Sequence, residues 1–168
     1  MALQLNLVGA GHVGRVLGRL LARQDGVDIG QVLTRSAASA RQAVDFIGAG
    51  QPVERYDQLQ AAQVHVLAVG DDQIEAACVA LAAAVPLAGS IVFHCSGALA
   101  STHLQAARDA GALVASVHPI RSFADPAAVA DHFDGTYCGV EGDAAALTVL
   151  IPALEAIGAQ PVPIDAGA

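Results

Sequence analysis

The sequence predicts an α/β protein with a doubly wound, mostly parallel sheet and helices on both faces. Short apolar runs alternate with longer amphipathic segments, the pattern of buried parallel strands and their crossover helices. A length of 168 residues suits one domain. Hydrophobic residues make up 54% of the chain and charged residues 14%, which excludes disorder and supplies a large core. We expect a single sheet of about six to eight strands.

Four strands are expected in the first half of the chain, with a helix after the first, second and fourth. The apolar runs place these strands at residues 3–8, 28–33, 52–54 and 64–69. The first helix follows the turn at Gly9–Gly14, because apolar residues then recur at helical spacing. The second helix is expected to end at Gly48, and the third covers residues 74–84.

The second half continues the alternation. Strands are expected at residues 91–95 and 113–117, with a helix over residues 99–110 between them. Asp125 is expected to cap a helix that has Pro126 at its first position. After a turn, a strand at 136–140, a helix capped by Asp143 and a short strand at 160–164 complete the pattern.

The charge balance argues against several partners. Eight arginines and no lysine stand against 16 acidic residues, and the net charge of -8 opposes binding to nucleic acid or anionic lipid. The absence of lysine removes Schiff-base chemistry. Charged or amide residues interrupt every apolar run before it could span a membrane, and no secretory signal is visible at the N-terminus. We expect a soluble, cytoplasmic protein.

Neither the cysteines nor most histidines suggest a special site. Cys78, Cys95 and Cys138 are odd in number, widely spaced and set in apolar stretches, which favours reduced core thiols over disulfides or zinc ligands. The remaining histidines show no metal-ligand spacing, so no metal site is predicted. These histidines are His65, His103 and His132.

The segment Gly9-Ala10-Gly11-His12-Val13-Gly14 has the GxGxxG pattern of dinucleotide-binding Rossmann domains. It follows the first strand and opens the first helix, which is the context that the pattern requires. Gly9 would permit the tight turn, Gly11 the approach of a pyrophosphate, and Gly14 close packing of the helix. Free backbone amides and the helix dipole would hold the anion without a lysine. The alternative is a strand-to-helix turn that binds no ligand.

The end of the second strand bears on which cofactor binds. NAD-selective domains usually place Asp or Glu there, whereas this chain has Thr34-Arg35-Ser36. The planar fork of Arg35 suits a 2'-phosphate and Ser36 can donate a hydrogen bond, so NADP(H) is favoured over NAD(H). Alternatively, Arg35 is merely solvated and Ser36 caps the second helix. Val69 and Gly70 are expected to line the cofactor, with the acids that follow them either lining it or capping the next helix.

Candidate catalytic residues follow the fifth and sixth strands, at the edge where ligands of such sheets bind. Ser96 would face the nicotinamide side of the cleft, and His118, followed by Pro119, could protonate or polarise a carbonyl or imine. His118 could equally be a structural donor at a rigid turn. His94 lies inside the strand pattern and is expected to be a packed core histidine.

Arg121 has two possible roles. It could bind a substrate carboxylate, or it could pair with Asp125 and hold the loop.

Together, the glycine turn, the segment His94-Cys95-Ser96-Gly97-Ala98 and the segment from His118 to Pro126 resemble an uncharacterised family of predicted oxidoreductases. Glu141-Gly142-Asp143 is also similar to a segment of that family. The resemblance implies a Rossmann domain followed by an all-helical domain of unassigned function. More distantly, the chain resembles pyrroline-5-carboxylate reductase, the β-hydroxyacid dehydrogenases and prephenate dehydrogenase. In prephenate dehydrogenases, a His-Pro pair and a Ser at corresponding positions belong to the active site.

These patterns leave two functions open. The first is the NADP-binding half of an oxidoreductase that acts on a small substrate and lacks activity without its helical domain. The second is a module that senses a dinucleotide without catalysis. The helical domain is not among the 168 residues, and the chain ends at 165–168 without a terminating feature, so we expect a fragment. An apolar face left open by missing helices would favour homo-oligomers.

Overall fold

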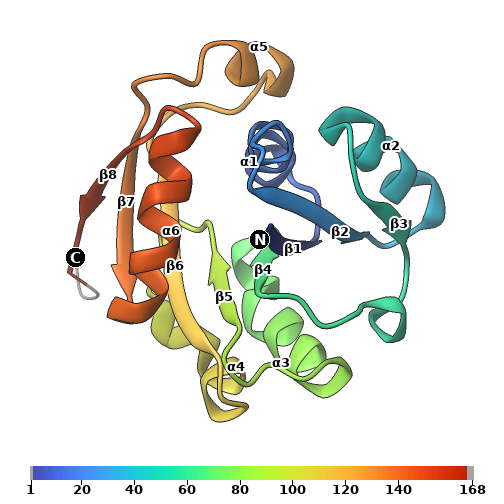
Figure 1. The fold of residues 1–168 in the computed structure, drawn as a ribbon. Coiled ribbons are helices and arrows are strands. Elements are labelled where there is room, and N and C mark those ends of the chain that lie inside the picture. Colours follow the sequence, from blue (N-terminus) through green and yellow to red (C-terminus); the bar gives the residue numbers. More distant parts are fainter. Residues whose placement is uncertain (1, 166–168) are drawn as a thin grey trace.

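Residues 2–165, described by the computed structural model, form an eight-stranded sheet with helices on both faces (Figure 1). The strands are β1 Leu3–Val8, β2 Val27–Leu33, β3 Gln51–Val53, β4 Val64–Leu67, β5 Ile91–His94, β6 Leu113–Pro119, β7 Tyr137–Gly142 and β8 Gln160–Pro163. The helices are α1 His12–Ala22, α2 Ala37–Ile47, α3 Ile74–Ala84, α4 Gln105–Asp109, α5 Pro126–Asp131 and α6 Ala144–Ala156. The expectation of a fragment concerned residues 165–168, and of these residues 166–168 lie outside the described residues.

The sheet has the order β3-β2-β1-β4-β5-β6-β7-β8. Strands β1 to β6 are parallel, β7 is antiparallel to β6, and β8 is parallel to β7. The direction of winding reverses between β1 and β4, and open sheets of this kind bind ligands at such a point. The predicted doubly wound, mostly parallel sheet is confirmed.

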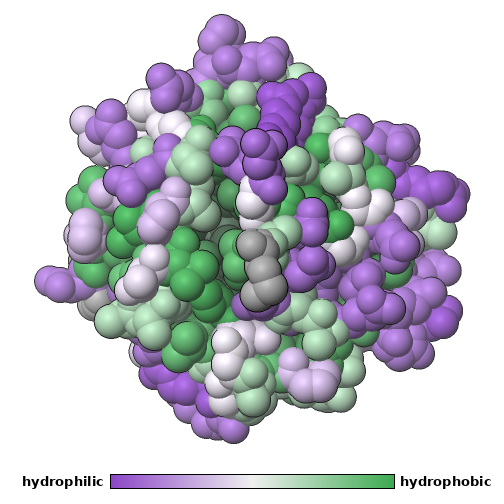
Figure 2. All heavy atoms as spheres, in the orientation of Figure 1, coloured by the Kyte–Doolittle hydropathy of each residue, from purple (hydrophilic) through white to green (hydrophobic). Residues whose placement is uncertain are grey.

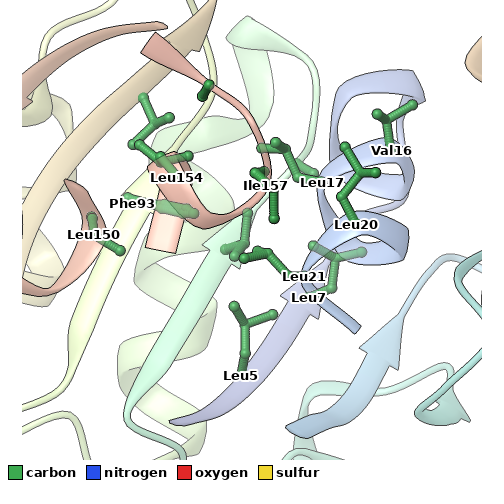
Figure 3. Close-up of a cluster of buried hydrophobic side chains, with 14 of the residues drawn as sticks. Leu5, Leu7, Val16, Leu17, Leu20, Leu21, Phe93, Leu150, Leu154 and Ile157 are labelled. Carbon is green, nitrogen blue, oxygen red and sulfur yellow. The ribbon is translucent and has the colours of Figure 1, made fainter. Parts of the chain in front are cut away.

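Two apolar clusters hold the layers together. Helices α1, α2, α5 and α6 contribute to the cluster on one face, and α3 and α4 contribute to the cluster on the other (Figure 1). In Figure 3, Leu21 of α1 lies beside Leu7 of β1, Leu17 of α1 lies beside Ile157, which follows α6, and Leu154 of α6 lies near Phe93 of β5. Apolar residues at helical spacing on α1 and α6 therefore fix these helices to the sheet.

Strand ends differ from the prediction at three places near the ligand-binding edge. Strand β6 continues to Pro119, so His118 and Pro119 end the strand instead of following it. The cause is β7, whose antiparallel pairing extends as far as Pro119. Strand β4 ends at Leu67, opposite the last residue of β1, and Val69 therefore lies in the following loop. Strand β5 ends at His94, one residue earlier than predicted.

The helix predicted over residues 99–110 is a 3₁₀ turn, Ser101–Leu104, followed by the short helix α4. The Glu141 carboxylate accepts a hydrogen bond from the backbone N–H of Ser101 at 2.8 Å and fixes the start of the turn. Turns of this kind, whose hydrogen bonds span one residue fewer than those of an α-helix, are frequent at helix ends.

Of the two predicted helix caps, the one by Asp125 is confirmed, and the alternative considered for Ser36, that it caps the second helix, is also confirmed. Ser36 caps α2 and Asp125 caps α5, each through its side-chain oxygen. Asp143 precedes α6 as expected, but its carboxylate accepts hydrogen bonds from the backbone N–H of Val114 at 2.8 Å and from Arg108 at 2.9 Å. It ties α6 to β6 instead of capping the helix.

A buried polar network lies between β1, β2 and β4. The Asn6 side chain accepts a hydrogen bond from the backbone N–H of Gln31 at 2.9 Å and donates one to the carbonyl of Gln60 at 2.7 Å. Asn6 lies at the register shift between β1 and β2, which falls between Leu5 and Leu7. His65 on β4 faces the Asn6 amide, and its Nε2 has no hydrogen-bond partner among residues 2–165. Burial lowers the pKa of His65 to about 4.

Hydrophobic residues are more frequent on the surface over α6 and β6 to β8, on the left of Figure 2, than over α2 and β3 on the right. The exposed large apolar side chains in this region are Ile120, Tyr137, Val149, Val162 and Ile164. Among the described residues, no helix is long and apolar enough to cross a membrane.

Candidate functional site

The candidate residues gather at one edge of the sheet. The loops that follow β1 to β5 and the last residues of β6 all lie at the carboxyl ends of parallel strands. Each predicted cofactor or catalytic residue comes from one of these loops, from the strand ends or from the start of α1. The topology therefore brings together segments that are more than a hundred residues apart in the sequence.

Two glycines of the turn after β1 are required by the fold. Gly9 has a φ of +80°, and a Cβ there would lie 2.5 Å from the carbonyl oxygen of Ala68. A Cβ on Gly14 would overlap the Cβ of Ala68, so Gly14 allows α1 to pack on the loop after β4. These are the structural roles predicted for the first and third glycines.

Gly11 is different because the protein itself does not require a glycine there. Its φ is -61°, a value open to any residue, and within the described part of the chain a Cβ would meet only the Ala68 carbonyl oxygen at 3.4 Å. Gly11 is exposed at the N-terminus of α1, where free backbone amides favour an anion. A glycine here leaves room for a ligand to approach the backbone.

A cavity of 780 Å³ opens beside the turn. It contains seven of the predicted cofactor residues, namely Gly9, Ala10, Gly11, Thr34, Arg35, Val69 and Gly70. Its walls also include Leu33 from β2, Tyr56, and Ala76, Ala77 and Ala80 from one face of α3. The remaining four predicted residues lie elsewhere. Val13 and Gly14 belong to α1, His12 lines a second cavity of 580 Å³, and Ser36 lies outside both cavity walls.

Of the polar side chains that follow β2, some make contacts within the protein and Arg35 remains exposed. The Ser36 hydroxyl accepts a hydrogen bond from the backbone N–H of Ser39 at 3.1 Å, so it serves the cap of α2. The Thr34 and Ser39 hydroxyls are hydrogen-bonded to each other. Arg35 is exposed and forms no ion pair within the described part of the chain. The guanidinium of Arg35 is thus available to an anion in the cavity.

The cavity residues that the sequence analysis missed include three that bear a charge or an aromatic ring. Arg15 belongs to α1, and its Nε donates a hydrogen bond to the Ala10 carbonyl at 3.0 Å, which holds the guanidinium beside the turn. Glu54 follows β3, and Tyr56 lies in the 3₁₀ turn after it. The position of Arg15 one residue after the last glycine was a usable signal. Nothing in the sequence pointed to Glu54 or Tyr56, because the sequence does not show that β3 pairs with β2 and so places them beside the cavity.

The structure brings His118 and the segment Ser96-Gly97 together. A Cβ on Gly97 would lie 2.5 Å from Nε2 of His118, so the imidazole rests directly on the Gly97 backbone. The Ser96 hydroxyl oxygen accepts a hydrogen bond from the backbone N–H of Ala98 at 3.0 Å, which leaves its own proton free to be donated. Neither ring nitrogen of His118 has a hydrogen bond to any residue in the 2–165 range. A half-buried imidazole at the end of β6 therefore lies against the residue that follows Ser96 in the loop after β5.

His94, the last residue of β5, holds the loop that carries Ser96 through hydrogen bonds to its backbone. It is fully buried, as predicted for a core histidine. Its Nδ1 accepts a hydrogen bond from the backbone N–H of Ser96 at 3.1 Å, so Nε2 carries the proton and donates to the Ala100 carbonyl at 3.0 Å. Burial lowers the pKa of His94, which keeps the ring neutral. His94 thus positions the loop that carries Ser96.

Several other candidates have structural contacts. Arg121 donates hydrogen bonds to the carbonyl of His132 at 2.7 Å and to the Thr136 hydroxyl at 3.3 Å, and it forms no ion pair with Asp125. Neither acid after Gly70 lines a cavity described above or caps α3 through its side chain. Within residues 2–165, no group of three His, Cys, Asp or Glu side chains could hold a metal ion.

The three cysteines are free thiols. Burial raises the pKa of Cys95 to about 12 and that of Cys138 to about 11, so these thiols stay protonated. Cys78 is fully buried and its pKa is also raised by burial.

Comparisons with known proteins support the fold. Residues 1–119 match the family described as "Rossmann-like domain". A solved structure from Thermotoga maritima is 28% identical, with a TM-score of 0.68 over 95% of this chain and 57% of that one. Synechocystis arogenate dehydrogenase is 18% identical, with a TM-score of 0.76 over 97% of this chain and 60% of that one. No curated protein matches the chain.

A prephenate dehydrogenase from A. aeolicus, solved with hydroxyphenyl propionate and NAD+, is 14% identical, with a TM-score of 0.78 over 99% of this chain and 61% of that one. The chain spans between 57% and 61% of the length of these three structures. The matches confirm the fold and the resemblance to oxidoreductases predicted from the sequence.

Proposed function

The chain belongs to the Rossmann-like domain family, and from that membership we propose that it binds NADP(H) and forms the cofactor-binding part of an oxidoreductase. The observation that carries the proposal is Gly11. Gly9 and Gly14 are glycines because the fold requires it, whereas a Cβ on Gly11 would meet, among residues 2–165, only the Ala68 carbonyl oxygen at 3.4 Å. In a turn that binds no ligand, this position would tolerate a larger residue.

The residues around the cavity fit a dinucleotide. The exposed amides at the start of α1 suit the pyrophosphate, with the Arg15 guanidinium held beside them. The apolar walls and Tyr56 suit the adenine ring. Arg35 suits a 2'-phosphate, since a guanidinium can bind phosphate through two parallel hydrogen bonds.

The second group of residues fits a proton-transfer role. When bound, a nicotinamide supplies or accepts a hydride. His118 would then donate a proton to, or take one from, the oxygen or nitrogen of a small carbonyl or imine substrate. The Ser96 hydroxyl would donate a hydrogen bond to the same atom and stabilise developing negative charge. Gly97 lets the imidazole approach this position, and His94 holds the serine loop.

We also propose that helices outside residues 2–165, or a second subunit, complete the substrate pocket, and that the chain alone is inactive. The support is the exposed apolar surface of β7 and β8, where Tyr137 is 55% and Val162 42% exposed. Residues Tyr137 and Val162 alternate along their strands with residues that face α6, so they lie on the opposite, open face. His118 lies on that same face, opposite Gly139 of β7.

Titration of the chain with NADPH and NADH, followed by fluorescence, tests the cofactor proposal. Arg35→Ala should weaken NADPH binding by about 10- to 100-fold, because a charge-assisted hydrogen bond contributes about 1.5–3 kcal/mol. NADH binding should change little. Arg41→Ala is the matched control, since Arg41 is also exposed but lies on α2 away from the cavity. Equal, weak binding of both dinucleotides by the parent would refute the preference for NADPH.

Chemistry is tested in a protein that has the helical part. His118→Ala should abolish NADPH-dependent reduction across a panel of 2-oxo acids and cyclic imines while leaving NADPH affinity intact. Unchanged turnover would remove His118 from the mechanism. Tight NADPH binding with no turnover in the unmodified protein would favour a sensor.

A further inference from the structure

The end of β3 places a carboxylate in the part of the cavity assigned above to the 2'-phosphate. Strand β3 pairs with β2 up to Leu33 and Val53, and the Thr34 N–H donates a hydrogen bond to the Val53 carbonyl at 3.2 Å. Glu54 follows directly, so it lies beside Thr34 at the edge of the sheet. Glu54, Thr34 and Arg35 all line the same cavity.

The Glu54 side chain is oriented by a specific contact. Its Oε2 accepts a hydrogen bond from the backbone N–H of Ala37, the first residue of α2, at 3.2 Å. The carboxylate therefore lies at the start of α2, two residues after Arg35, and both side chains line the cavity. Glu54 forms no ion pair with Arg35 within residues 2–165. It also uses an amide that a phosphate could otherwise bind.

Arg35 and Glu54 have opposite effects on the ligand that binds between them. A guanidinium attracts a 2'-phosphate, whereas a carboxylate repels it and instead accepts hydrogen bonds from the two hydroxyls of an unphosphorylated ribose. In the usual NAD-selective arrangement, the acid stands at the end of the second strand. Here the neighbouring strand supplies it.

We infer that Glu54 is a specificity-determining residue that completes the ribose subsite from β3 and limits the preference for NADPH. This inference rests on the proposed dinucleotide function. Because both determinants are present, the chain binds NADPH and NADH with affinities that differ by less than Arg35 alone would produce. Removal of the Glu54 charge shifts the balance toward NADPH.

Glu54→Gln tests the inference without disturbing the fold, because the amide oxygen of glutamine can still accept the hydrogen bond from Ala37. Asp57→Asn is the matched control. It changes the net charge equally, three residues further on, at an exposed side chain that pairs with Arg55 outside the cavity. Both variants and the parent are titrated with NADPH and NADH, and with 2',5'-ADP and 5'-AMP as probes of the adenosine end alone.

Glu54→Gln should tighten NADPH and 2',5'-ADP about tenfold and weaken NADH and 5'-AMP about threefold, whereas Asp57→Asn should leave the ratios unchanged. Identical effects of the two substitutions would overturn the inference, because they would show a response to net charge only. A parent chain that binds neither dinucleotide would overturn the proposed function, and the inference with it. Binding of both dinucleotides with no change in Glu54→Gln would overturn the inference alone.

Discussion

A comparison of Gly11→Ala with Gly14→Ala separates a ligand-binding turn from a purely structural one. A methyl group on Gly14 would overlap Ala68 and force α1 away from the sheet, and overpacking of this kind costs about 1–3 kcal/mol. A methyl group on Gly11 would meet nothing closer than 3.4 Å, at a φ of -61° that alanine adopts without strain. Replacing a glycine at a compatible position stabilises a protein by about 0.4–1 kcal/mol.

The two variants should therefore change stability and binding in different proportions. Urea denaturation should show Gly14→Ala destabilised and Gly11→Ala as stable as the parent or slightly more so. Titration should show that Gly11→Ala has lost about 10- to 100-fold in NADPH affinity, because the methyl group prevents the approach of the pyrophosphate to one or more backbone amides. A stable Gly11→Ala variant with parental affinity would refute the assignment of Gly11 to the ligand.

Three further predictions concern the core and the catalytic side. The unfolded chain protonates His65 near pH 6.5 and the folded chain only near pH 4, so stability should be intact above pH 6.5 and fall by about 3 kcal/mol as the pH drops through that window. His65→Gln should flatten this part of the curve in urea denaturations, and an unchanged slope would contradict the assignment. Asn6→Ala should cost about 2–4 kcal/mol in the same assay, since it leaves a buried N–H of Gln31 and a carbonyl without partners; parental stability would contradict the role of the network. Gly97→Ala should displace the His118 ring and lower turnover of the complete protein at least about 100-fold with little loss of NADPH affinity, and full activity would argue against His118 as the acid.

The sequence was sufficient for the fold, and most of the cofactor residues that it suggested line one cavity. Hydrophobic periodicity placed all eight strands within a few residues, and the glycine turn was recognised because its spacing coincided with a strand end and a helix start. Arg35 was identified as a candidate because it follows the second predicted strand directly, so that its place needed no knowledge of tertiary contacts.

Contacts between segments distant in the sequence could not be predicted. The contact of His118 with Gly97 depends on the register of β5 against β6, and the position of Glu54 depends on β3 pairing with β2. Strand β6 was predicted too short because its antiparallel partner, which extends it to Pro119, follows later in the chain. The local pattern identified which residues could act, and tertiary pairing decided which of them meet.

The most direct test of a dinucleotide site over the glycine turn is a ¹H–¹⁵N NMR titration of the chain with NADPH. The backbone amides of Gly9 to Gly11, of Thr34 and Arg35, and of Val69 and Gly70 should shift together and saturate with a single dissociation constant. The amides of β8 and α6, which lie far from the cavity wall, should not respond. Saturating NADPH that leaves the glycine turn unshifted, or shifts confined to another surface, would contradict the central claim.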